Sequence, residues 1–266
     1  MTSLSSASES IELNALTAIH QTASPEVQQR LGLQLKNIGG IICSTSSKDP
    51  SILINRCFVS DNRILQDHVT LQKIKDFYSQ NAIKKFFLHV TNPSQQTSEA
   101  LSHAGFQKAR SWMKFSRDTT LHSFPTKRNV KQITSEHAEH FARIVAPCFD
   151  LDETSITLIA SMINHPNWHL FMAFDGDVPA ATGALFYEHG IGYCDWGATH
   201  RDYRQRGFQG ALLAARVNAA IAMGAGSIIT ATGEEVPGDP QHSYKNILRS
   251  GFKENYLREN WVPTDS

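Results

Sequence analysis

The chain has 266 residues, of which 41% are hydrophobic, and its 25 basic side chains balance 25 acidic ones. This length suits one large domain or two ordinary ones, and the composition argues against a disordered chain, a nucleic-acid-binding protein and attraction to anionic lipid. The first ten residues, MTSLSSASES, lack the basic cluster and apolar segment of a signal peptide, and no apolar run reaches the ~20 residues that cross a bilayer. We therefore expect a cytoplasmic protein whose partner is a small polar molecule.

The cysteines indicate neither a disulfide framework nor a metal site. They form no C-x-x-C pair and have no histidines at the spacing of a zinc site. They are Cys43, Cys57, Cys148 and Cys194. We expect buried free thiols, and no metal is implied.

A polar segment, residues 118–130, separates two stretches that each mix helix and strand patterns, and we place a domain boundary there. Before it, ILINRCFVS and IKKFFLHV have the composition of strands. Between them, TLQKIKDFYSQ puts its apolar residues on one helical face, and a further short helix ends at Gly105. The first half is therefore predicted to be mixed helix and strand.

The second half opens with two amphipathic helices, HAEHFARIVAPCF and TSITLIASMIN. Three strand-like runs follow, WHLFMAFDG, PAATGALFYEHG and IGYCDWGAT, with turn residues between them. A long helix, the strand SIITAT, a short helix over residues 243–250 and a last strand FKENYLREN complete the chain.

A faint internal repeat links the two halves. The segment ALSHAGFQKARSWMKF resembles ILRSGFKENYLRENW when Gly105 is aligned with Gly251, and the same alignment pairs Phe115 with Trp261. Two related folds in tandem explain such a repeat.

The stretch YRQRGFQGALL, residues 203–213, begins the long helix, because Leu213, Val217 and Ile221 recur at helical spacing and Gly207 lies at the first turn. The first N–H groups of a helix lack intrahelical partners and the helix dipole is positive there, so such a turn can hold a phosphate. The neighbouring arginines add forked donors. Neither a P-loop ending nor a G-x-G-x-x-G motif is present. The alternative is a helix whose glycines only permit close packing.

The order of strands, hairpin, R-x-x-G helix, strand, N-x-x-x-x-G-F and last strand resembles the GCN5-related N-acetyltransferase (GNAT) family over Val130 to Pro263. In that family the motif Q/R-x-x-G-x-G/A binds the pyrophosphate of acetyl-CoA. The resemblance assigns this role to Arg204, Gln205, Arg206, Gly207, Phe208 and Gln209. Gln209 replaces the usual glycine or alanine, and Gly210 follows it. The resemblance also implies that Gly197, Ala198 and Thr199 pair with the acetyl and pantetheine arm and that Asn246 contacts it. The alternative for Gly197 to Thr199 is an ordinary strand end. The alternative for Asn246 is a position on a solvent-facing helix.

The same resemblance implies the fold class. We expect an α/β chain with two GNAT-like domains in tandem, residues 1–122 and 130–266, each with a mixed, mostly antiparallel sheet flanked by helices. The second is expected to be catalytic, with a splayed central strand.

The general acid of the family is absent from its usual position. Many members carry a tyrosine four residues before the glycine of the Gly-Phe pair, where this chain has Ile247. Tyr256 and Tyr244 are the nearby phenols, and strand alternation places Tyr256 on the face of Phe252 and Arg258. The alternative is that both tyrosines are structural aromatic residues. In that case water supplies the proton to the departing thiolate.

An ammonium acceptor with a pKa of ~10.4 must lose a proton before it attacks. Asp195 and Glu188 are the candidate bases, directly or through water, and Asp195 is otherwise a structural carboxylate. The loop GEEVPGD, with Glu234, Glu235 and Asp239, is a candidate cation attractor. His189, His200 and the thiol of Cys194 are weaker candidates, since no catalytic partner is placed beside them.

The first half lacks the phosphate turn, because residues 61–71 contain no glycine. We expect a degenerate repeat that binds no CoA and that covers or shapes the acceptor pocket; an unrelated domain is the alternative. For the whole chain we expect direct acetyl transfer from acetyl-CoA to a small-molecule or protein amine, by a monomer or homodimer. The alternatives are a non-catalytic acyl-CoA sensor or partner subunit and a structural protein without ligand.

Overall fold

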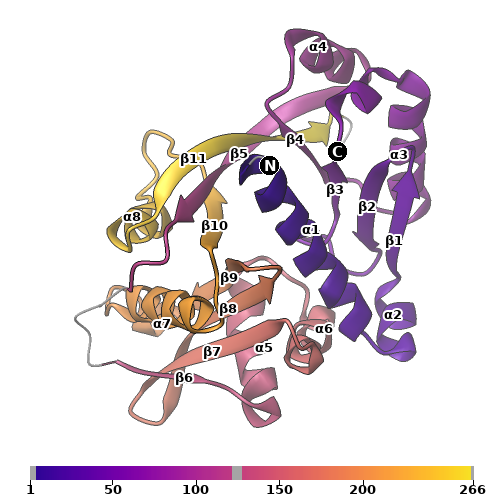
Figure 1. The fold of residues 1–266 in the computed structure, drawn as a ribbon. Helices are drawn as coiled ribbons and strands as arrows, with labels where there is room; N and C mark the ends of the chain where they lie inside the picture. Colours follow the sequence, from indigo (N-terminus) through magenta and orange to yellow (C-terminus); the bar gives the residue numbers. More distant parts are fainter. Residues whose placement is uncertain (1–3, 122–127, 265–266) are drawn as a thin grey trace. The chain divides into compact units, whose positions relative to one another are not determined.

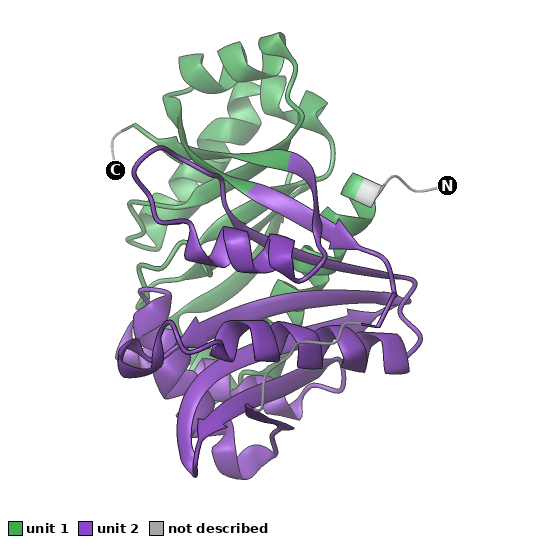
Figure 2. Ribbon diagram, turned by 90° about the vertical axis from the view of Figure 1, so that its left-hand side faces the viewer, with its two compact units in different colours: residues 1–112, 257–266 green, residues 113–256 purple. Residues whose placement is uncertain are grey.

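The computed structural model describes residues 4–121 and 128–264. The chain forms two compact units, which we call unit 1 (residues 1–112 and 257–266) and unit 2 (residues 113–256); Figure 2 shows them in green and purple. Part of the predicted boundary segment, 122–127, lies outside the described residues. The division into domains at residues 1–122 and 130–266 stays a prediction.

Unit 1 contains four helices, a 3-10 turn and four strands, and shares two further strands with unit 2 (Figure 1). In chain order they are α1 (Leu4–Thr22), α2 (Pro25–Leu31), β1 (Leu33–Ile38), β2 (Ile41–Ser46), β3 (Arg56–Val59), η1 (Asn62–Gln66), α3 (His68–Gln80), β4 (Phe87–Thr91), α4 (Gln95–His103), the first part of β5 (Phe106–Arg117) and the last part of β11 (Lys253–Pro263). The helix predicted between the two strands and the one ending at Gly105 are confirmed as α3 and α4.

Unit 2 holds the remaining elements. Its helices are α5 (Ala138–Cys148), α6 (Ile156–Ser161), α7 (Phe208–Ala222) and α8 (His242–Arg249), with short 3-10 turns η2 (Ser135–His137), η3 (Glu153–Ser155), η4 (Met162–Asn164) and η5 (Arg201–Tyr203). Its strands are β6 (Asn129–Gln132), β7 (Trp168–Asp175), β8 (Val178–Glu188), β9 (Ile191–Thr199), β10 (Ser227–Gly233) and the adjoining parts of β5 and β11. Every helix and strand predicted for this half is confirmed.

The strand predicted over ILINRCFVS is too long. Only its second half, from Arg56, is a strand, because Asn55 holds the preceding residues in a turn. The amide Nδ2 of Asn55 donates to the carbonyls of Asp49, at 2.6 Å, and Ser51, at 3.1 Å. The patterns also gave no prediction for residues 4–46, which form two helices and two strands.

The described strands all belong to one mixed sheet. In unit 1 the strand order is β1-β2-β3-β4-β11, in which β3 and β4 are parallel and the other pairs antiparallel. In unit 2 the order is β5-β10-β9-β8-β7-β6, in which β9 and β10 are parallel and β9/β8, β8/β7 and β7/β6 antiparallel. A large mixed sheet flanked by helices is thus confirmed, and a separate sheet for each of two domains is not.

The internal repeat is visible in the element order. The series β3-α3-β4-α4-β5 has the same order as β9-α7-β10-α8-β11. The aligned glycines, Gly105 and Gly251, follow α4 and α8 with φ of 77° and 79°, a conformation that favours glycine. Phe106 and Phe252, directly after them, are both buried. The repeat found in the sequence therefore marks the same structural turn twice.

Helix α7 positions the candidate site because its apolar face packs on strands β8 and β9 of unit 2 (Figure 1). Phe208, Leu212 and Val217 from this helix join a core that includes Leu185 and Cys194 from the strands. The burial of Phe208 beside Gly207 fixes the start of the helix relative to the sheet.

Candidate functional site

The turn that opens α7 is open to an external anion. Gly207 is the N-cap residue, with φ of 81°, and within residues 4–121 and 128–264 no side chain caps the helix. A Cβ atom added at Gly207 would meet no atom within 4 Å. The unpaired N–H groups and the positive end of the helix dipole therefore face solvent at this turn.

Arginines surround the turn. Arg204 and Arg206 are exposed; Arg204 Nε donates to the carbonyl of Thr199 at 3.4 Å, and Arg206 pairs with Asp175 at 3.2 Å. Arg128, which sequence analysis did not single out, donates from Nε to the carbonyl of Arg206 at 3.0 Å. Arg128 also pairs with Asp175, at 3.6 Å, so this carboxylate holds Arg128 and Arg206 near the turn, beside Arg204.

The predicted splay of the central strand is confirmed. The parallel pairing of β9 with β10 ends at the Cys194–Thr230 pair, although β9 continues to Thr199 and β10 to Gly233. On its other edge β9 stays paired with β8 as far as Thr199. The peptide groups of Gly197, Ala198 and Thr199 therefore lie where the two parallel strands have separated.

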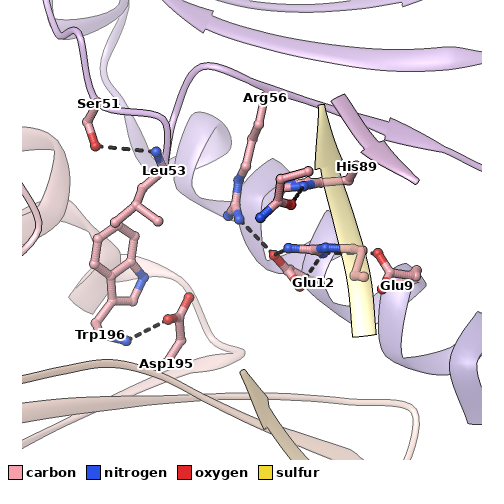
Figure 3. A network of polar contacts seen from close by, with 10 residues as sticks. Glu9, Glu12, Ser51, Leu53, Arg56, His89, Asp195 and Trp196 are labelled. Atoms are coloured by element: carbon pink, nitrogen blue, oxygen red, sulfur yellow. Dashed lines mark hydrogen bonds and ion pairs between the residues drawn. The ribbon is translucent and has the colours of Figure 1, made fainter. Parts of the chain in front are cut away.

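A β-bulge distorts β9 at the same point. The register with β8 shifts between Thr182, which pairs with Ala198, and Ala184, which pairs with Asp195. Trp196, inside the bulge, has φ of 51°, an unusual value for a bulky residue, and its backbone N–H donates to the Asp195 carboxylate at 2.8 Å (Figure 3). The bulge turns the backbone of β9 away from a regular ladder next to the splay.

A cavity of about 100 Å³ lies at the splay. Residues from β9, β10, α7 and α8 line it, together with Phe149 after α5. Among the residues predicted for the site, its lining includes Asp195, Gly197 and Gln209, and also Ser243, Ile247 and Cys194. The cavity thus extends from Gln209, in the first turn of α7, to Trp196 in the bulge.

Residues predicted separately on α7 and α8 meet beside this cavity. Asn246 Nδ2 donates to Gln209 Oε1 at 2.6 Å, and Gln209 Nε2 donates to Ser243 Oγ at 3.3 Å. Gln209, at the position where the family has glycine or alanine, therefore binds α8. Phe208 and Gly210, its neighbours, are buried in the helix packing.

The candidate bases are separated by the structure. Asp195 lines the cavity, but Glu188 lies at the far end of the β8/β9 hairpin, where it accepts from Asn167 Nδ2 at 3.0 Å. Four residues along β9, at ~3.3 Å each, separate Asp195 from Ile191, the partner of Glu188. His189 shares that hairpin and is exposed. Asp195 is therefore the better placed carboxylate.

Of the remaining polar candidates, only Cys194 belongs to the cavity lining. Glu234, Glu235 and Asp239 are on the loop between β10 and α8, and His200 precedes η5, where its Nδ1 accepts from Asp202 at 3.4 Å. The thiol of Cys194 is buried, and burial raises its pKa, so it is a poor nucleophile.

Neither tyrosine lines the cavity. The hydroxyl of Tyr244 donates to Glu254 at 2.5 Å, and burial together with this carboxylate raises the pKa of the phenol. Tyr256 does share the inward side of its strand with buried Phe252 and Arg258. Strand β5, however, lies between β11 and β10, so at ~4.8 Å per strand Tyr256 is about 10 Å from β10. The role predicted for Tyr256 stays a prediction, without a direct path to the cavity.

Sequence reasoning missed Arg216, which is 2% exposed and lines the cavity from α7. Its Nε donates to the carbonyl of Leu212 at 3.1 Å, and its Nη1 to those of Asp195, at 3.0 Å, and Ala184, at 3.3 Å. A sequence signal existed, because Arg216 follows Leu213 by three residues and so lies on the apolar face of the helix.

In unit 1 the helix N-termini after β3 are capped by carboxylates. Asp61 accepts from the backbone N–H of Arg63 at 2.9 Å, and Asp67 accepts from those of Val69, at 3.1 Å, and Thr70, at 3.2 Å. A carboxylate already occupies the place where a phosphate would bind, and its charge repels another anion.

Unit 1 also contains a buried ion network (Figure 3). Glu12 on α1 contacts Arg56 at 2.7 Å and Arg258 at 2.8 Å, and Glu9 contacts Arg258 at 3.0 Å. The side chains of Glu12 and Arg258 are 0% exposed. Each buried charge of this network therefore has a partner of opposite sign.

Within residues 4–121 and 128–264, no group of three or more histidine, cysteine, aspartate or glutamate side chains is arranged to hold a metal ion. No helix in the same part of the chain is both long and apolar enough to cross a membrane.

Comparison with known proteins shows the fold. No family model and no curated protein matches the chain. A GCN5-related N-acetyltransferase from Kribbella flavida matches in structure with a TM-score of 0.63 at 15% identity, covering 94% of this chain and 96% of that one. A GCN5-related N-acetyltransferase from Sphaerobacter thermophilus gives 0.62 at 13% identity, with 90% and 85% covered. A tandem GNAT protein from the clavulanic acid biosynthesis pathway, solved without AcCoA, gives 0.60 at 12% identity, with 94% and 93% covered. The chain therefore has the GNAT fold over most of its length, as predicted.

Proposed function

We propose that this protein transfers an acyl group from coenzyme A to an amine, with the acyl donor bound in unit 2. Acetyl-CoA is the donor expected from the family that the sequence resembles. The observation that carries the proposal is the uncapped, glycine-led N-terminus of α7 beside the splay of β9 and β10. Proteins with the same fold include N-acetyltransferases, which supports the reaction class.

In this proposal the pyrophosphate of CoA accepts from the first N–H groups of α7, with Arg204 and Arg206 beside it. The acyl-bearing arm passes into the splay, where the peptide groups of Gly197 to Thr199 are available for pairing. Asn246, held by Gln209, lies beside that path. The residues at the turn fit an anion, because an added Cβ at Gly207 meets only open space and no carboxylate caps the helix.

The transfer is direct in this proposal. The amine lone pair attacks the thioester carbonyl carbon, the C–N bond forms and the C–S bond breaks. Asp195 is the proposed acceptor of the amine proton, directly or through water, because it is the carboxylate that lines the cavity. Water is the proposed proton donor to the departing thiolate, since an ordinary thiol pKa of ~8.5 makes a dedicated acid helpful but not essential.

The second candidate is a non-catalytic acyl-CoA-binding protein. It is favoured by Ile247, an apolar residue that lines the cavity at the position where many GNAT enzymes carry the acid. Incubation with acetyl-CoA and a panel of amines separates the two, with free CoA thiol as the readout. Thiol release with an amine supports the transferase, and binding without release supports the sensor.

The binding claim is tested by thermal denaturation with CoA. A ligand that binds only the native state stabilises it by about 2.7 kcal/mol at a hundredfold excess over Kd. We expect Gly207→Glu to abolish this shift, because its carboxylate enters the anion site. Gly190→Glu is the matched control, since Gly190 also has a positive φ and an open surround but lies in the β8/β9 hairpin. No shift with the unmodified protein at millimolar CoA would contradict the proposal.

A further inference from the structure

Arg216 is a buried cation whose hydrogen bonds leave one nitrogen directed at the cavity. Nε and Nη1 donate to the three backbone carbonyls described above. Nη2 has no hydrogen-bond partner among residues 4–121 and 128–264. A Cβ atom added at Gly197, which lines the cavity, would stand 3.6 Å from Nη2. The guanidinium edge therefore lies beside the part of β9 that has left the β10 ladder.

The strands around Arg216 are shaped to admit its guanidinium. At Gly183, on β8, an added Cβ would come within 2.7 Å of both Cζ and Nε of Arg216. The bulge in β9, opposite Gly183, turns the carbonyl of Asp195 toward Nη1. Glycine on one strand and a bulge on the next thus hold the guanidinium plane in one orientation.

In the part of the chain that the structure describes, Arg216 lacks the close carboxylate partner that the buried side chains of Arg56 and Arg258 have. Arg258 and Arg56 each lie against a carboxylate, whereas within the described residues Arg216 has no carboxylate oxygen within 4.0 Å. Burial lowers the pKa of Arg216, and the nearest acidic side chain, that of Asp195, gives only longer-range support. A buried charge is costly unless an anion or strong acceptors neutralise it, so this position favours an anionic ligand group.

The position on α7 relates Arg216 to the donor. It lies nine residues after Gly207, about 14 Å along the helix at 1.5 Å per residue. The cavity between them is lined by polar groups of Gln209, Ser243, Thr230 and Thr232. A donor with its phosphates at the helix N-terminus therefore has its acyl end near the guanidinium.

We propose that Arg216 binds a carboxylate at the free end of the acyl group, so that the preferred donor is a CoA thioester of a dicarboxylic acid, of the malonyl or succinyl class. This inference rests on the proposed function and specifies its acyl group. A carboxylate oxygen accepts a charge-assisted hydrogen bond from Nη2, whereas the methyl group of acetyl leaves that donor unpaired. The transfer reaction itself is unchanged, with the same C–N bond formed and C–S bond broken.

The test compares succinyl-CoA with butyryl-CoA, which has the same number of acyl carbon atoms and no carboxylate. Calorimetry with the unmodified protein is expected to give a Kd for succinyl-CoA at least about tenfold lower than for butyryl-CoA. In Arg216→Met the two Kd values are expected to become equal, with the Kd for CoA itself changed by less than about threefold. Because Arg216 also holds the bulge, the comparison in the unmodified protein decides the matter if this variant does not fold.

The outcomes separate this inference from the proposed function. If CoA and both thioesters bind with equal affinity, the carboxylate site is wrong and the proposed function stands. If none of the three ligands binds, both are wrong. A preference for succinyl-CoA that persists undiminished in folded Arg216→Met would also overturn the role of Arg216.

Discussion

The two units share a series of elements but differ in how their helix N-termini are capped and how their buried arginines are paired. In unit 1 the helix starts after β3 are capped by Asp61 and Asp67, and the buried arginines are paired with Glu9 and Glu12. In unit 2 the helix start after β9 has a glycine without a cap, and the buried Arg216 donates only to carbonyls among the described residues. Unit 1 satisfies its charges internally, and unit 2 leaves two positive sites for a ligand.

The two series differ in whether a carboxylate caps the helix N-terminus that follows the parallel strand. The backbone that places a helix N-terminus at the end of a parallel strand is the same in both series. A carboxylate at that N-terminus neutralises the dipole and removes the anion site, whereas glycine keeps it.

Removal of the shared carboxylate in unit 1 is expected to cost the most stability. Glu12→Gln leaves Arg56 and Arg258 buried without their full countercharge, and breaking a buried pair costs about 3–5 kcal/mol. The free energy of unfolding, from urea denaturation, measures this loss. Glu139→Gln is the control, because its pair with Arg143 is exposed on α5 and should change stability little. Equal stability of Glu12→Gln and the unmodified protein would show that the network contributes nothing.

Acid is expected to destabilise unit 1 through a buried histidine. Burial lowers the pKa of His20 from 6.5 to about 4, and the ring contacts Ser44 Oγ at 2.8 Å. At pH values between 4 and 6.5, His20 binds a proton in the unfolded chain but not in the folded chain. The contribution is therefore complete above pH 6.5 and is lost as the pH falls toward 4, by about 3 kcal/mol in all. His20→Asn should flatten the urea stability profile over this range; an unchanged slope would exclude His20 as a cause.

Loss of a helix cap in unit 1 is expected to cost about 1 kcal/mol without creating a CoA site. Asp67→Ala removes the acceptor for the N–H groups of Val69 and Thr70. The stability of the variant should fall by that amount, and its CoA stoichiometry should equal that of the unmodified protein. A second bound CoA would show that the carboxylate alone had kept unit 1 inactive.

The smallest effect is expected for the tyrosines of unit 2. Because β5 separates β11 from β10, Tyr256→Phe should leave turnover within about twofold of the unmodified protein from pH 6 to 9. Tyr244→Phe should behave alike, since its hydroxyl is bound to Glu254. A tenfold or larger loss in Tyr256→Phe, with unchanged CoA affinity, would instead identify the general acid that sequence analysis favoured.

Sequence patterns predicted the helices and strands of unit 2 except β5 and β6, because the predicted segments have clear apolar periodicity or turn residues at their ends. They also predicted the glycine turn that opens α7, since its glycine and arginines are contiguous in the chain. They could not show that β5 lies beside β10, because pairing between distant strands leaves no local pattern. For that reason Tyr256 was favoured on alternation alone. Arg216 was missed because its partners are backbone carbonyls, which any sequence supplies.

The central claim is that one anion site, at Gly207, binds CoA in this chain. Isothermal titration calorimetry of the full chain with CoA measures the number of sites directly. We expect a stoichiometry near one for the unmodified protein and for Asp67→Ala, and no binding for Gly207→Glu. Two sites in the unmodified protein, or binding that survives in Gly207→Glu, would contradict the claim.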